Sequence, residues 1–362
     1  MTEQNNHRDE LTLVIGSYTD SLPHVVAQGR GISILRLAAD TGQLTPVSVF
    51  TGLRNPTYLA LGKDHRTLYS VEELAEKDGA AVVVLSLDAQ MGEMRVIARI
   101  GAKGDWPCHV SLDHEERRLF VSNYLSGNFI TAELDASGLP AGPVVNIQRS
   151  GTGPNASRQE GPHVHQVTVT PDGRRVLVCD AGTDEIARHG IGPGLIDPEP
   201  DALVKTTGGH LPRHLAFSTD GTRFFVVNEL GCAVSIYSYS EKEIRLIDEV
   251  STLPDDFVGE SACAAIRVHP GGRFVYASNR GHDTIVAFEV NPENGGLKPT
   301  GWYSTRGAVP RDFAIDPSGR YLVAANQDSH SLAVFRIDPV SGALAPMGNT
   351  YATGSPVCVL FA

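Results

Sequence analysis

Two histidines separated by a single residue precede an apolar run in the stretch QEGPHVHQVTVTPDG, which extends from Gln159 to Gly173. An imidazole can serve as a metal ligand, as a general base or as an ordinary hydrogen-bonded side chain. If the run is a strand, His163 and His165 point to the same face, because side chains alternate along a strand. The rest of the chain must decide which of these roles applies.

A metal site is poorly supported around this pair. Zinc needs at least a third ligand from Cys, His, Asp or Glu at workable spacing. The chain contains no HExxH motif, no oxygen-rich calcium loop and no nucleotide-binding fingerprint. We therefore expect neither a metal nor an organic cofactor.

The composition indicates a protein with a sizeable core and an acidic balance of charge. Of the 362 residues, 41% are hydrophobic and 20% are charged, and the formal net charge is -12. A nucleic-acid partner is not expected, because binding to phosphate backbones requires clustered Lys and Arg. The polar N-terminus lacks the apolar core of a secretory signal, and no apolar run approaches the roughly 18 residues of a membrane helix. We therefore expect a cytoplasmic protein that does not enter a membrane.

The five cysteines lie far apart, at positions 108, 179, 232, 263 and 358, and form no CxxC pair. Their odd number does not suit a disulfide framework. Reduced, buried thiols are the expected state in a cytoplasmic protein.

A repeated hairpin organises the chain. Each copy has a short strand, a turn rich in Asp and Gly, and a second apolar strand that ends in a polar residue. The copies are PTYLALGKDHRTLYSVEE from Pro56, PCHVSLDHEERRLFVSNY from Pro107, VHQVTVTPDGRRVLVCDA from Val164, PRHLAFSTDGTRFFVVNE from Pro212, CAAIRVHPGGRFVYASNR from Cys263 and PRDFAIDPSGRYLVAANQ from Pro310. A repeat of about 50 residues is typical of a propeller or another array.

The repeat that begins at Pro212 shows what one unit contains. It holds four β-branched and aromatic runs, HLAFS, RFFVVNE, AVSIYSYS and IRLIDEVS, separated by turn residues. Four strands in a unit of this size predict one propeller blade. WD dipeptides are absent, so the array is not of the WD40 type.

The two ends of the chain supply one further blade. SPVCVLFA at the C-terminus resembles the first strand of a blade, and LTLVIGSYT from Leu11 resembles a second strand. The polar residues that close the second strands number seven, and they are Ser17, Glu72, Asn123, Asp180, Asn228, Asn279 and Asn326. The sequence therefore predicts an all-β fold: a seven-bladed β-propeller with four-stranded blades, closed by pairing of the N- and C-terminal strands. We expect a polar tail over residues 1–10 and a single propeller over 11–362, because no linker interrupts the repeat.

Counting from the hairpin turns predicts which residues face one another at the channel. It places Arg213 opposite Asn228, Arg311 opposite Asn326 and His165 opposite Asp180. First strands line the channel of a propeller, so this register should ring one of its mouths. The residues there are His109, His163, His165, Gln166, Arg213, His214, Arg311 and Asp312 from first strands and Glu229, Arg280 and Gln327 from second-strand ends. The opposite hairpin ends carry ordinary turn sequences, which favours the His- and Arg-rich mouth as the functional end.

Four long stretches resemble a known family: GTGPNASRQEGPHVHQ, LPRHLAFSTDGTRFFVVNEL, AAIRVHPGGRFVYASNRGHDTI and VPRDFAIDPSGRYLVAANQDS. They are similar to the seven-bladed lactonase family, which includes propeller-type 6-phosphogluconolactonases and a fungal carboxy-muconate cyclase. The resemblance implies a catalytic His165, Arg213, Glu229 and Arg280. Cys232 and the pair Cys263-Ala264 depart from the plainer residues expected there.

These residues favour hydrolysis of a sugar lactone by direct attack of water, with 6-phosphogluconolactone as the leading substrate. No GxSxG motif or other nucleophile beside a base is present. The base is His165 or Glu229, and arginines near Glu229 would lower its pKa and favour His165. The loop that begins at Arg149 could bring Arg158 into the mouth. The substrate-binding residues expected are His109, Arg158, His163, Gln166, His214, Arg311 and Gln327.

Two other functions fit the same mouth. A cycloisomerase acting on a carboxylated muconate-type lactone would use the same arginines and an acid–base pair without water at the carbonyl. A non-catalytic binding module would favour exposed aromatic residues over His, Arg and Glu. In each enzymatic case the partner is a small anionic lactone, and the protein is expected to be a monomer or a homodimer.

Overall fold

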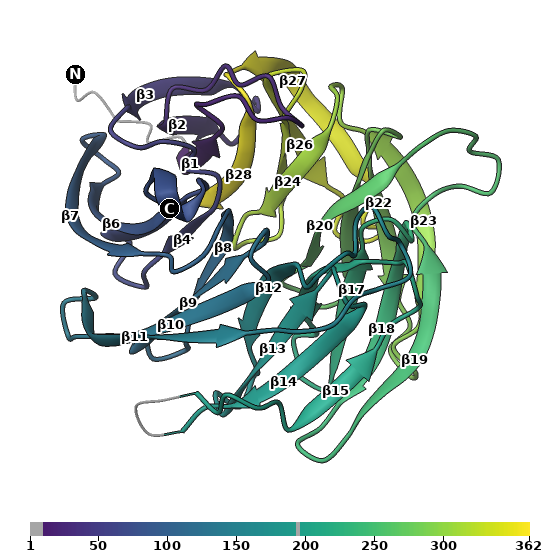
Figure 1. Ribbon diagram of the computed structural model, residues 1–362. Helices are drawn as coiled ribbons and strands as arrows, with labels where there is room; N and C mark the ends of the chain where they lie inside the picture. Colours follow the sequence, from purple (N-terminus) through teal and green to yellow (C-terminus); the bar gives the residue numbers. More distant parts are fainter. Residues whose placement is uncertain (1–9, 193–195) are drawn as a thin grey trace, which may run out of the picture.

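The computed structural model describes residues 10–192 and 196–362, which form seven four-stranded antiparallel sheets arranged in a ring (Figure 1). Within this part of the chain the one helical element is the short 3-10 helix η1 (Glu76–Asp78). The predicted all-β, seven-bladed propeller is therefore confirmed. The tail expected over residues 1–10 lies outside the described residues except for Glu10, which begins the first strand.

The strands fall into four classes by their position in a blade. The first, innermost strands are β28 (Pro356–Phe361), β4 (Leu59–Leu61), β8 (Pro107–Leu112), β12 (Val164–Val169), β16 (Pro212–Phe217), β20 (Ala262–Val268) and β24 (Pro310–Ile315). The second strands are β1 (Glu10–Ser17), β5 (Thr67–Glu72), β9 (Arg118–Asn123), β13 (Arg175–Asp180), β17 (Arg223–Asn228), β21 (Phe274–Arg280) and β25 (Tyr321–Asn326). The third strands are β2 (Ile32–Ala38), β6 (Ala81–Asp88), β10 (Asn128–Leu134), β14 (Glu185–Gly190), β18 (Ala233–Tyr239), β22 (Thr284–Val290) and β26 (Ser331–Ile337). The outer strands are β3 (Leu44–Phe50), β7 (Glu93–Gly101), β11 (Pro140–Gln148), β15 (Ala202–Lys205), β19 (Ile244–Ser251), β23 (Leu297–Ser304) and β27 (Leu344–Ala352).

The hydrophobic core lies between blades. We number the blades from the one that contains β1, so that β16 to β19 form blade 5 and β20 to β23 form blade 6. Phe225 and Ile236 of blade 5 pack in one cluster with Val275 and Phe288 of blade 6. Second strands are sandwiched between neighbours, and every residue of β25 is buried. Because both faces of a second strand are buried, the second strands are continuous apolar runs. The core between the blades is thus apolar, and polar side chains can occupy the channel.

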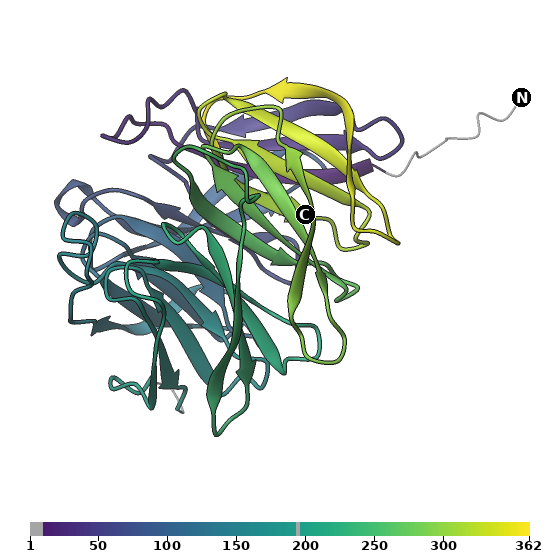
Figure 2. The same ribbon diagram turned by 90° about the vertical axis from the view of Figure 1, so that its right-hand side faces the viewer.

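The ring closes where the two ends of the chain meet. β28 pairs with β1, and Leu360 lies opposite Val14 while Cys358 lies opposite Gly16. Figures 1 and 2 show the yellow C-terminal strands and the purple N-terminal strands within one sector of the ring. First strands of neighbouring blades then contact one another all the way round, including β24 with β28 and β28 with β4.

The register at the channel end differs from the predicted one. Pro212 lies opposite Asn228 and His214 lies opposite Val227, so Arg213 occupies a β-bulge. The predicted pairing of Arg213 with Asn228 was therefore wrong, because a bulge inserts one residue that counting from the turn does not include.

The same bulge recurs in other blades. His165 is the inserted residue of β12, where Val164 lies opposite Asp180, and Arg311 is the inserted residue of β24, where Pro310 lies opposite Asn326. The predicted pairings of His165 and Arg311 were wrong for the same reason. The inserted residues are released from the regular ladder at the end of the strand that lines the channel.

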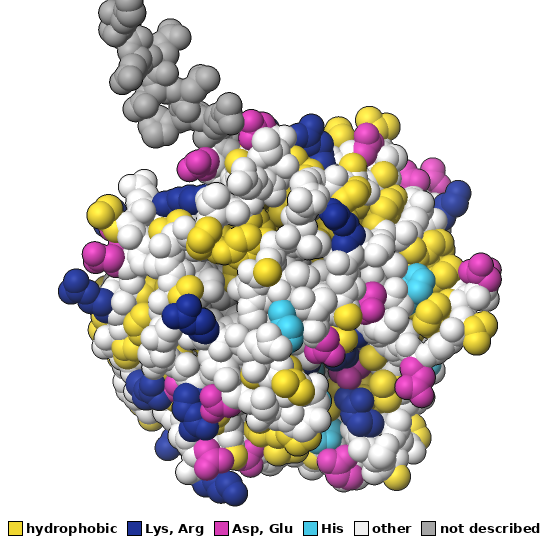
Figure 3. Space-filling view, turned by 90° about the horizontal axis from the view of Figure 1, so that it is seen from above, with side chains coloured by type: hydrophobic (Ala, Val, Ile, Leu, Met, Phe, Trp, Pro, Cys, Tyr) yellow, Lys and Arg dark blue, Asp and Glu magenta, His cyan; other side chains and the backbone are white. Residues whose placement is uncertain are grey.

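On the face shown in Figure 3, Lys and Arg side chains are interspersed with Asp and Glu side chains. That face therefore has no continuous basic surface to which a polyanion could bind. Among residues 10–192 and 196–362, no helix is long and apolar enough to cross a membrane.

Candidate active site

A polar cavity of about 350 Å³ lies at the end of the channel where the first strands begin. Its walls combine four arginines, two glutamates, two histidines, two aromatic side chains and a thiol. They are His24, Glu73, Trp106, Cys108, Tyr124, Arg158, His165, Arg213, Glu229, Arg280 and Arg311. A small void of about 10 Å³ lies next to it, and Glu73, Cys108, Arg213 and Arg311 line both.

Two repeated backbone positions supply most of this wall. The first is the bulge of the innermost strand, which contributes Cys108, His165, Arg213 and Arg311. The second is the residue that follows the polar closing residue of the second strand, and it contributes Glu73, Tyr124, Glu229 and Arg280. The ring symmetry of the fold thus brings equivalent positions of different blades into one cavity.

Glu229 is the centre of a cluster of guanidinium groups. Its carboxylate lies 2.7 Å from Arg158 Nη2, 3.3 Å from Arg280 Nη2 and 3.5 Å from Arg213 Nε. Burial alone would raise the pKa of Glu229, but the charges of Arg280, Arg213 and Arg158 outweigh it and hold the pKa well below its ordinary value. A carboxylate held in this way is a weak base that positions its arginines.

Arg213 and Arg280 are fixed by the backbone as well as by Glu229. Arg213 Nη1 donates a hydrogen bond to the carbonyl of Ala264 at 2.6 Å, and Arg280 Nη2 donates to the carbonyl of Cys263 at 2.8 Å. Burial and the charges of Arg280 and Arg311 lower the pKa of Arg213 to about 10. Arg213 therefore stays charged at neutral pH, and its guanidinium is held in one orientation.

His165 is a buried imidazole on the cavity wall. Its ring meets the rings of Tyr124 and His214 edge to face, at centroid separations of 5.6 and 4.9 Å. Burial and the charge of Arg213 lower the pKa of His165 well below its ordinary value, against the opposite effect of Glu229. His165 is therefore neutral at pH 7, which is the form a general base needs, although the lowered pKa also weakens it as a base.

Arg311 has no carboxylate partner. Its guanidinium lies over the ring of Tyr18 at 5.5 Å from the centroid, and within the described residues no carboxylate oxygen lies within 4.0 Å of its nitrogens. Among the described residues Arg311 thus lacks the direct ion pair that Arg158 and Arg280 make with Glu229, although Glu73 and Glu229 act on its charge from a longer distance.

Sequence reasoning missed Glu73, Cys108 and Tyr124 on this wall. Glu73 accepts hydrogen bonds from the hydroxyl groups of Tyr18 and Thr57. A signal was present, since Glu73 and Tyr124 follow the closing residue of their strands as Glu229 does. His24 and Trp106, whose rings lie 5.8 Å apart, come from connecting segments and carry no such signal.

Three predicted residues are brought close to the cavity but do not line it. His163 stacks on Tyr124 at 4.6 Å, and its Nδ1 lies 2.9 Å from the Tyr124 carbonyl oxygen. His214 lines the small void, and its ring lies 5.6 Å from the ring of His109, which in turn packs at 4.4 Å on Tyr58. These three histidines therefore lie behind the side chains that line the cavity, and their predicted contact with substrate stays a prediction.

Two further predicted residues serve contacts within the protein. The side-chain oxygen of Gln166 accepts a hydrogen bond from the backbone of Leu215 in the next blade. Gln327 is buried and donates to Asp328 at 2.7 Å. Gln166 thus joins two blades, whereas Gln327 contacts the next residue in the chain. Both were predicted to bind substrate because of their position near the mouth, and that role stays a prediction.

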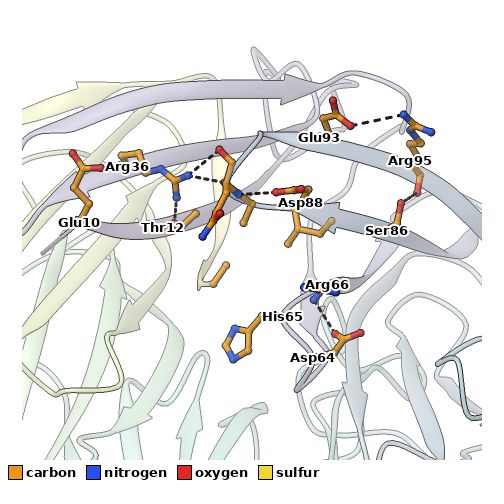
Figure 4. A pocket seen from close by; sticks show the side chains of 14 residues that line it. Glu10, Thr12, Arg36, Asp64, His65, Arg66, Ser86, Asp88, Glu93 and Arg95 are labelled. Atoms are coloured by element: carbon orange, nitrogen blue, oxygen red, sulfur yellow. Dashed lines mark hydrogen bonds and ion pairs between the residues drawn. The ribbon is translucent and has the colours of Figure 1, made fainter. Parts of the chain in front are cut away.

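A larger hollow lies elsewhere. It has a volume of about 1210 Å³ and is lined by turn residues from the opposite ends of the hairpins and by strand edges (Figure 4). Its charges are satisfied locally: Arg36 donates to Thr12 and to the carbonyl of Ala89, and Arg95 pairs with Glu93. This hollow is the larger of the two, but buried charged side chains converge in the smaller cavity. We therefore take the smaller cavity as the candidate active site.

The described residues contain no cluster of three or more His, Cys, Asp or Glu side chains with the geometry to hold a metal ion. The predictions of no metal and no cofactor stay predictions.

Known proteins similar to this chain agree with the fold. Residues 12–361 match the family described as lactonase, 7-bladed beta-propeller. A 6-phosphogluconolactonase of Bacillus subtilis is 34% identical over 304 residues, which cover 83% of this chain and 84% of that protein.

Solved structures give the same result. The periplasmic gluconolactonase of Pseudomonas aeruginosa superposes with a TM-score of 0.89 at 31% identity, over 97% of this chain and 99% of that chain. A structure from Bacteroides fragilis, provisionally assigned as a 6-phosphogluconolactonase, gives 0.88 at 31% identity over 98% of both chains. The chain therefore belongs to the lactonase family of seven-bladed β-propellers.

Proposed function

We propose that the protein hydrolyses 6-phosphogluconolactone to 6-phosphogluconate in the cavity around Glu229 and Arg311. Family membership and the similar protein from Bacillus subtilis support lactone hydrolysis as the general reaction. The choice of a phosphorylated lactone rests on one observation, the excess of positive charge in the cavity.

Four arginines and two glutamates line the cavity. With both glutamates ionised, the guanidinium groups leave a surplus of two positive charges. His24 does not change this balance at neutral pH, because burial and the charges of Arg311 and Arg280 lower its pKa to about 4. A phosphate monoester carries about 1.5 to 2 negative charges at pH 7 and would neutralise this surplus. An unphosphorylated sugar lactone would leave it unbalanced.

Arg311 is the natural contact for the phosphate, because among the described residues it is the cavity arginine without a carboxylate within ion-pair distance. Guanidinium groups bind phosphate oxygens in a bidentate geometry. Arg158, which reaches the cavity from a loop and has 37% of its side chain exposed, is positioned to add a second contact at the entrance.

The ester chemistry falls to His165 and Arg213. His165 takes a proton from the attacking water as its oxygen bonds to the carbonyl carbon, and Arg213 stabilises the negative charge that develops on the carbonyl oxygen. The tetrahedral intermediate then collapses, the ring C–O bond breaks, and the proton passes from His165 to the leaving oxygen. One positioned base supplies about 10²–10⁴-fold, and one oxyanion donor supplies about 10²–10³-fold.

Glu229 holds Arg213 and Arg280 in place and favours the imidazolium that forms on His165. Glu73 is the second carboxylate of the cavity and the competitor for the role of base. It is held by hydroxyl groups, without an arginine within ion-pair distance among the described residues. The variants His165→Asn and Glu73→Gln therefore separate the two assignments.

The test is hydrolysis of freshly generated 6-phosphogluconolactone, with the spontaneous rate subtracted, with and without EDTA. Glucono-lactone without phosphate and a carboxylated muconate-type lactone serve as comparison substrates. We expect fast turnover of the phosphorylated lactone, insensitive to EDTA and lost in Arg213→Ala. Absence of acceleration over the spontaneous rate would contradict the proposal, and preference for the carboxylated lactone would transfer it to that class of substrate. The cytoplasmic location and the monomeric or dimeric state stay predictions.

A further inference from the structure

Two of the five thiols lie together directly behind the cavity wall. Cys232 is in the turn between β17 and β18, in a left-handed backbone conformation with φ of 45°. Cys263 belongs to β20 of the adjacent blade and is completely buried. Cys232 packs against the interblade cluster that contains Cys263. Its thiol donates to the carbonyl of Ser261 at 3.1 Å, and the thiol of Cys263 donates to Asn279 Oδ1 at 3.3 Å. Thr252 bridges the two cysteines, because its hydroxyl lies 2.9 Å from the Cys232 carbonyl oxygen and 3.1 Å from Cys263 Sγ.

Cys232 differs from the other thiols in exposure and acidity. It is partly exposed, whereas Cys108, Cys179, Cys263 and Cys358 are buried. The neighbouring thiol of Cys263 is the largest influence on it, and with the hydrogen bond to Ser261 and the charge of Arg280 it lowers the pKa of Cys232 to about 7 although burial opposes this. Burial raises the pKa of the other four thiols. A thiolate is the reactive form of cysteine, so a reactive thiol and a second thiol in contact with it lie side by side.

We propose that Cys232 and Cys263 form an oxidisable pair, in which a peroxide oxidises Cys232 and Cys263 then closes a disulfide between blades 5 and 6. In the first step the Cys232 thiolate attacks one oxygen of hydrogen peroxide, the O–O bond breaks, and a sulfenic acid and water are produced after protonation. In the second step the Cys263 sulfur attacks the sulfenic sulfur, and the hydroxyl group leaves as water. Two thiols are oxidised, one peroxide is reduced, and two water molecules are formed.

The position of the pair links this modification to the cavity. The backbone N–H of Cys263 donates to the carbonyl of Glu229 at 2.8 Å, and the carbonyl of Cys263 accepts from Arg280. Closure of a disulfide must bring the two sulfurs to about 2.05 Å, and it therefore moves β20 against the turn that follows Glu229. We expect the oxidised protein to turn over lactone more slowly, on the order of tenfold, because small displacements of catalytic groups have large effects on rate.

The covalent part of the proposal is tested without any substrate. The full-length protein is treated with stoichiometric hydrogen peroxide at pH 7, blocked by alkylation and mapped by mass spectrometry without reduction. We expect a peptide that joins Cys232 to Cys263 and that dithiothreitol separates. In Cys263→Ser we expect a sulfenic acid on Cys232 that dimedone traps, and in Cys232→Ser we expect no cross-link. Cys179→Ser is the matched control, a substitution of a buried and remote thiol, and it should cross-link like the parent protein.

Three results would overturn the proposal. The first is that peroxide produces no cross-link in the parent protein. The second is that dimedone labels Cys232 no faster than it labels the three isolated thiols. The third is that the cross-link forms completely and turnover stays unchanged. The effect on turnover rests on the proposed function, whereas the cross-link does not. A protein that hydrolyses no lactone in either redox state would therefore remove the proposed function, and the mass spectra would still decide the thiol proposal.

Discussion

Arg311 shows how the environment of one residue sets its expected role. Arg158, Arg213 and Arg280 share the charge of Glu229, but Arg311 has an aromatic ring beneath it and an open cavity in front of it. The sequence predicted that an arginine would stand near the mouth at this position. It could not show that Arg311 would lack an ion pair, because the carboxylate of one blade can be shared by arginines of several blades, as that of Glu229 is.

The first prediction therefore concerns Arg311→Ala. Loss of a hydrogen-bonded charge contact of about 1.5–3 kcal/mol should raise KM for 6-phosphogluconolactone roughly 10- to 100-fold. Turnover of the unphosphorylated lactone should change little, because that substrate has no phosphate for Arg311 to bind. Steady-state kinetics on both substrates measure the effect, and Arg336→Ala, an exposed arginine of β26, is the control. Equal losses on both substrates would contradict the assignment of Arg311 to the phosphate.

The second prediction concerns the pH dependence of turnover. His165 must be neutral to accept a proton, and its pKa lies well below the ordinary 6.5 of histidine. The acid limb of the pH–rate profile should therefore lie below pH 6.5, and activity should persist as pH falls through that value. His165→Asn should lose about 10²–10⁴-fold in kcat and lose this limb. If Glu73→Gln removes the limb while His165→Asn retains turnover, the base is Glu73.

At the scale of the strand, the polar residue that closes each second strand has a structural function that sequence reasoning only partly described. The side-chain amides of Asn123, Asn279 and Asn326 donate to the carbonyls of Ala102, Thr252 and Thr305, at 2.8 to 2.9 Å. Each acceptor follows the outer strand of the preceding blade. The amides therefore hold the segment that crosses from one blade to the next.

The third prediction follows from this clasp. Asn326 is buried, so Asn326→Ala leaves the carbonyl of Thr305 without its donor and should lower the free energy of unfolding by about 1–3 kcal/mol. Urea denaturation followed by fluorescence measures the change. Asn349→Ala, at an exposed position of the outer strand β27, should change it by less than about 0.5 kcal/mol. Equal effects of the two substitutions would rule out the clasp as a source of stability.

The bulges explain why strand positions were predictable and side-chain positions were not. The repeated hairpins, with Pro212 and Pro310 at the start of their first strands, located the strands well. A bulge at Arg213 leaves no mark in one sequence, because a hairpin with or without it has the same apolar pattern. Predicted substrate contacts such as Gln166 therefore lie against a neighbouring blade, while Glu73, at a position equivalent to Glu229, was overlooked.

For the whole molecule, the buried neutral histidines predict sensitivity to acid. Burial lowers the pKa of His109 to about 3 and lowers the pKa of His214 well below 6.5. In the unfolded chain each would take up a proton near pH 6.5, so the unfolded state binds more protons below that pH. Their contribution to stability is therefore present above pH 6.5 and is lost as pH falls towards the folded pKa, by up to about 1.4 kcal/mol per pH unit for each histidine.

The fourth prediction isolates one of these groups. Between pH 6 and 4.5, the free energy of unfolding of His214→Gln should fall less steeply than that of the parent protein, by up to about 1.4 kcal/mol per pH unit. Urea denaturation at a series of pH values gives both slopes. The comparison is needed because burial raises the pKa of Asp180 and Asp312, and these carboxyl groups act in the opposite direction. Parallel slopes would show that His214 is not neutral in the folded protein.

Pairing of β28 with β1 has a consequence for the order of events during synthesis. The segment that completes the ring, Pro356–Phe361, is the last strand of the ring to be synthesised, and its partner β1 is the first. His165, Arg213, Glu229 and Arg280 are all synthesised before it, but β24 and β4 cannot both gain their innermost neighbour until it arrives. The nascent chain would thus carry every residue of the cavity and no finished cavity, and a propeller that lacked this strand would leave the inner edge of β1 unpaired for chaperones or proteases to find.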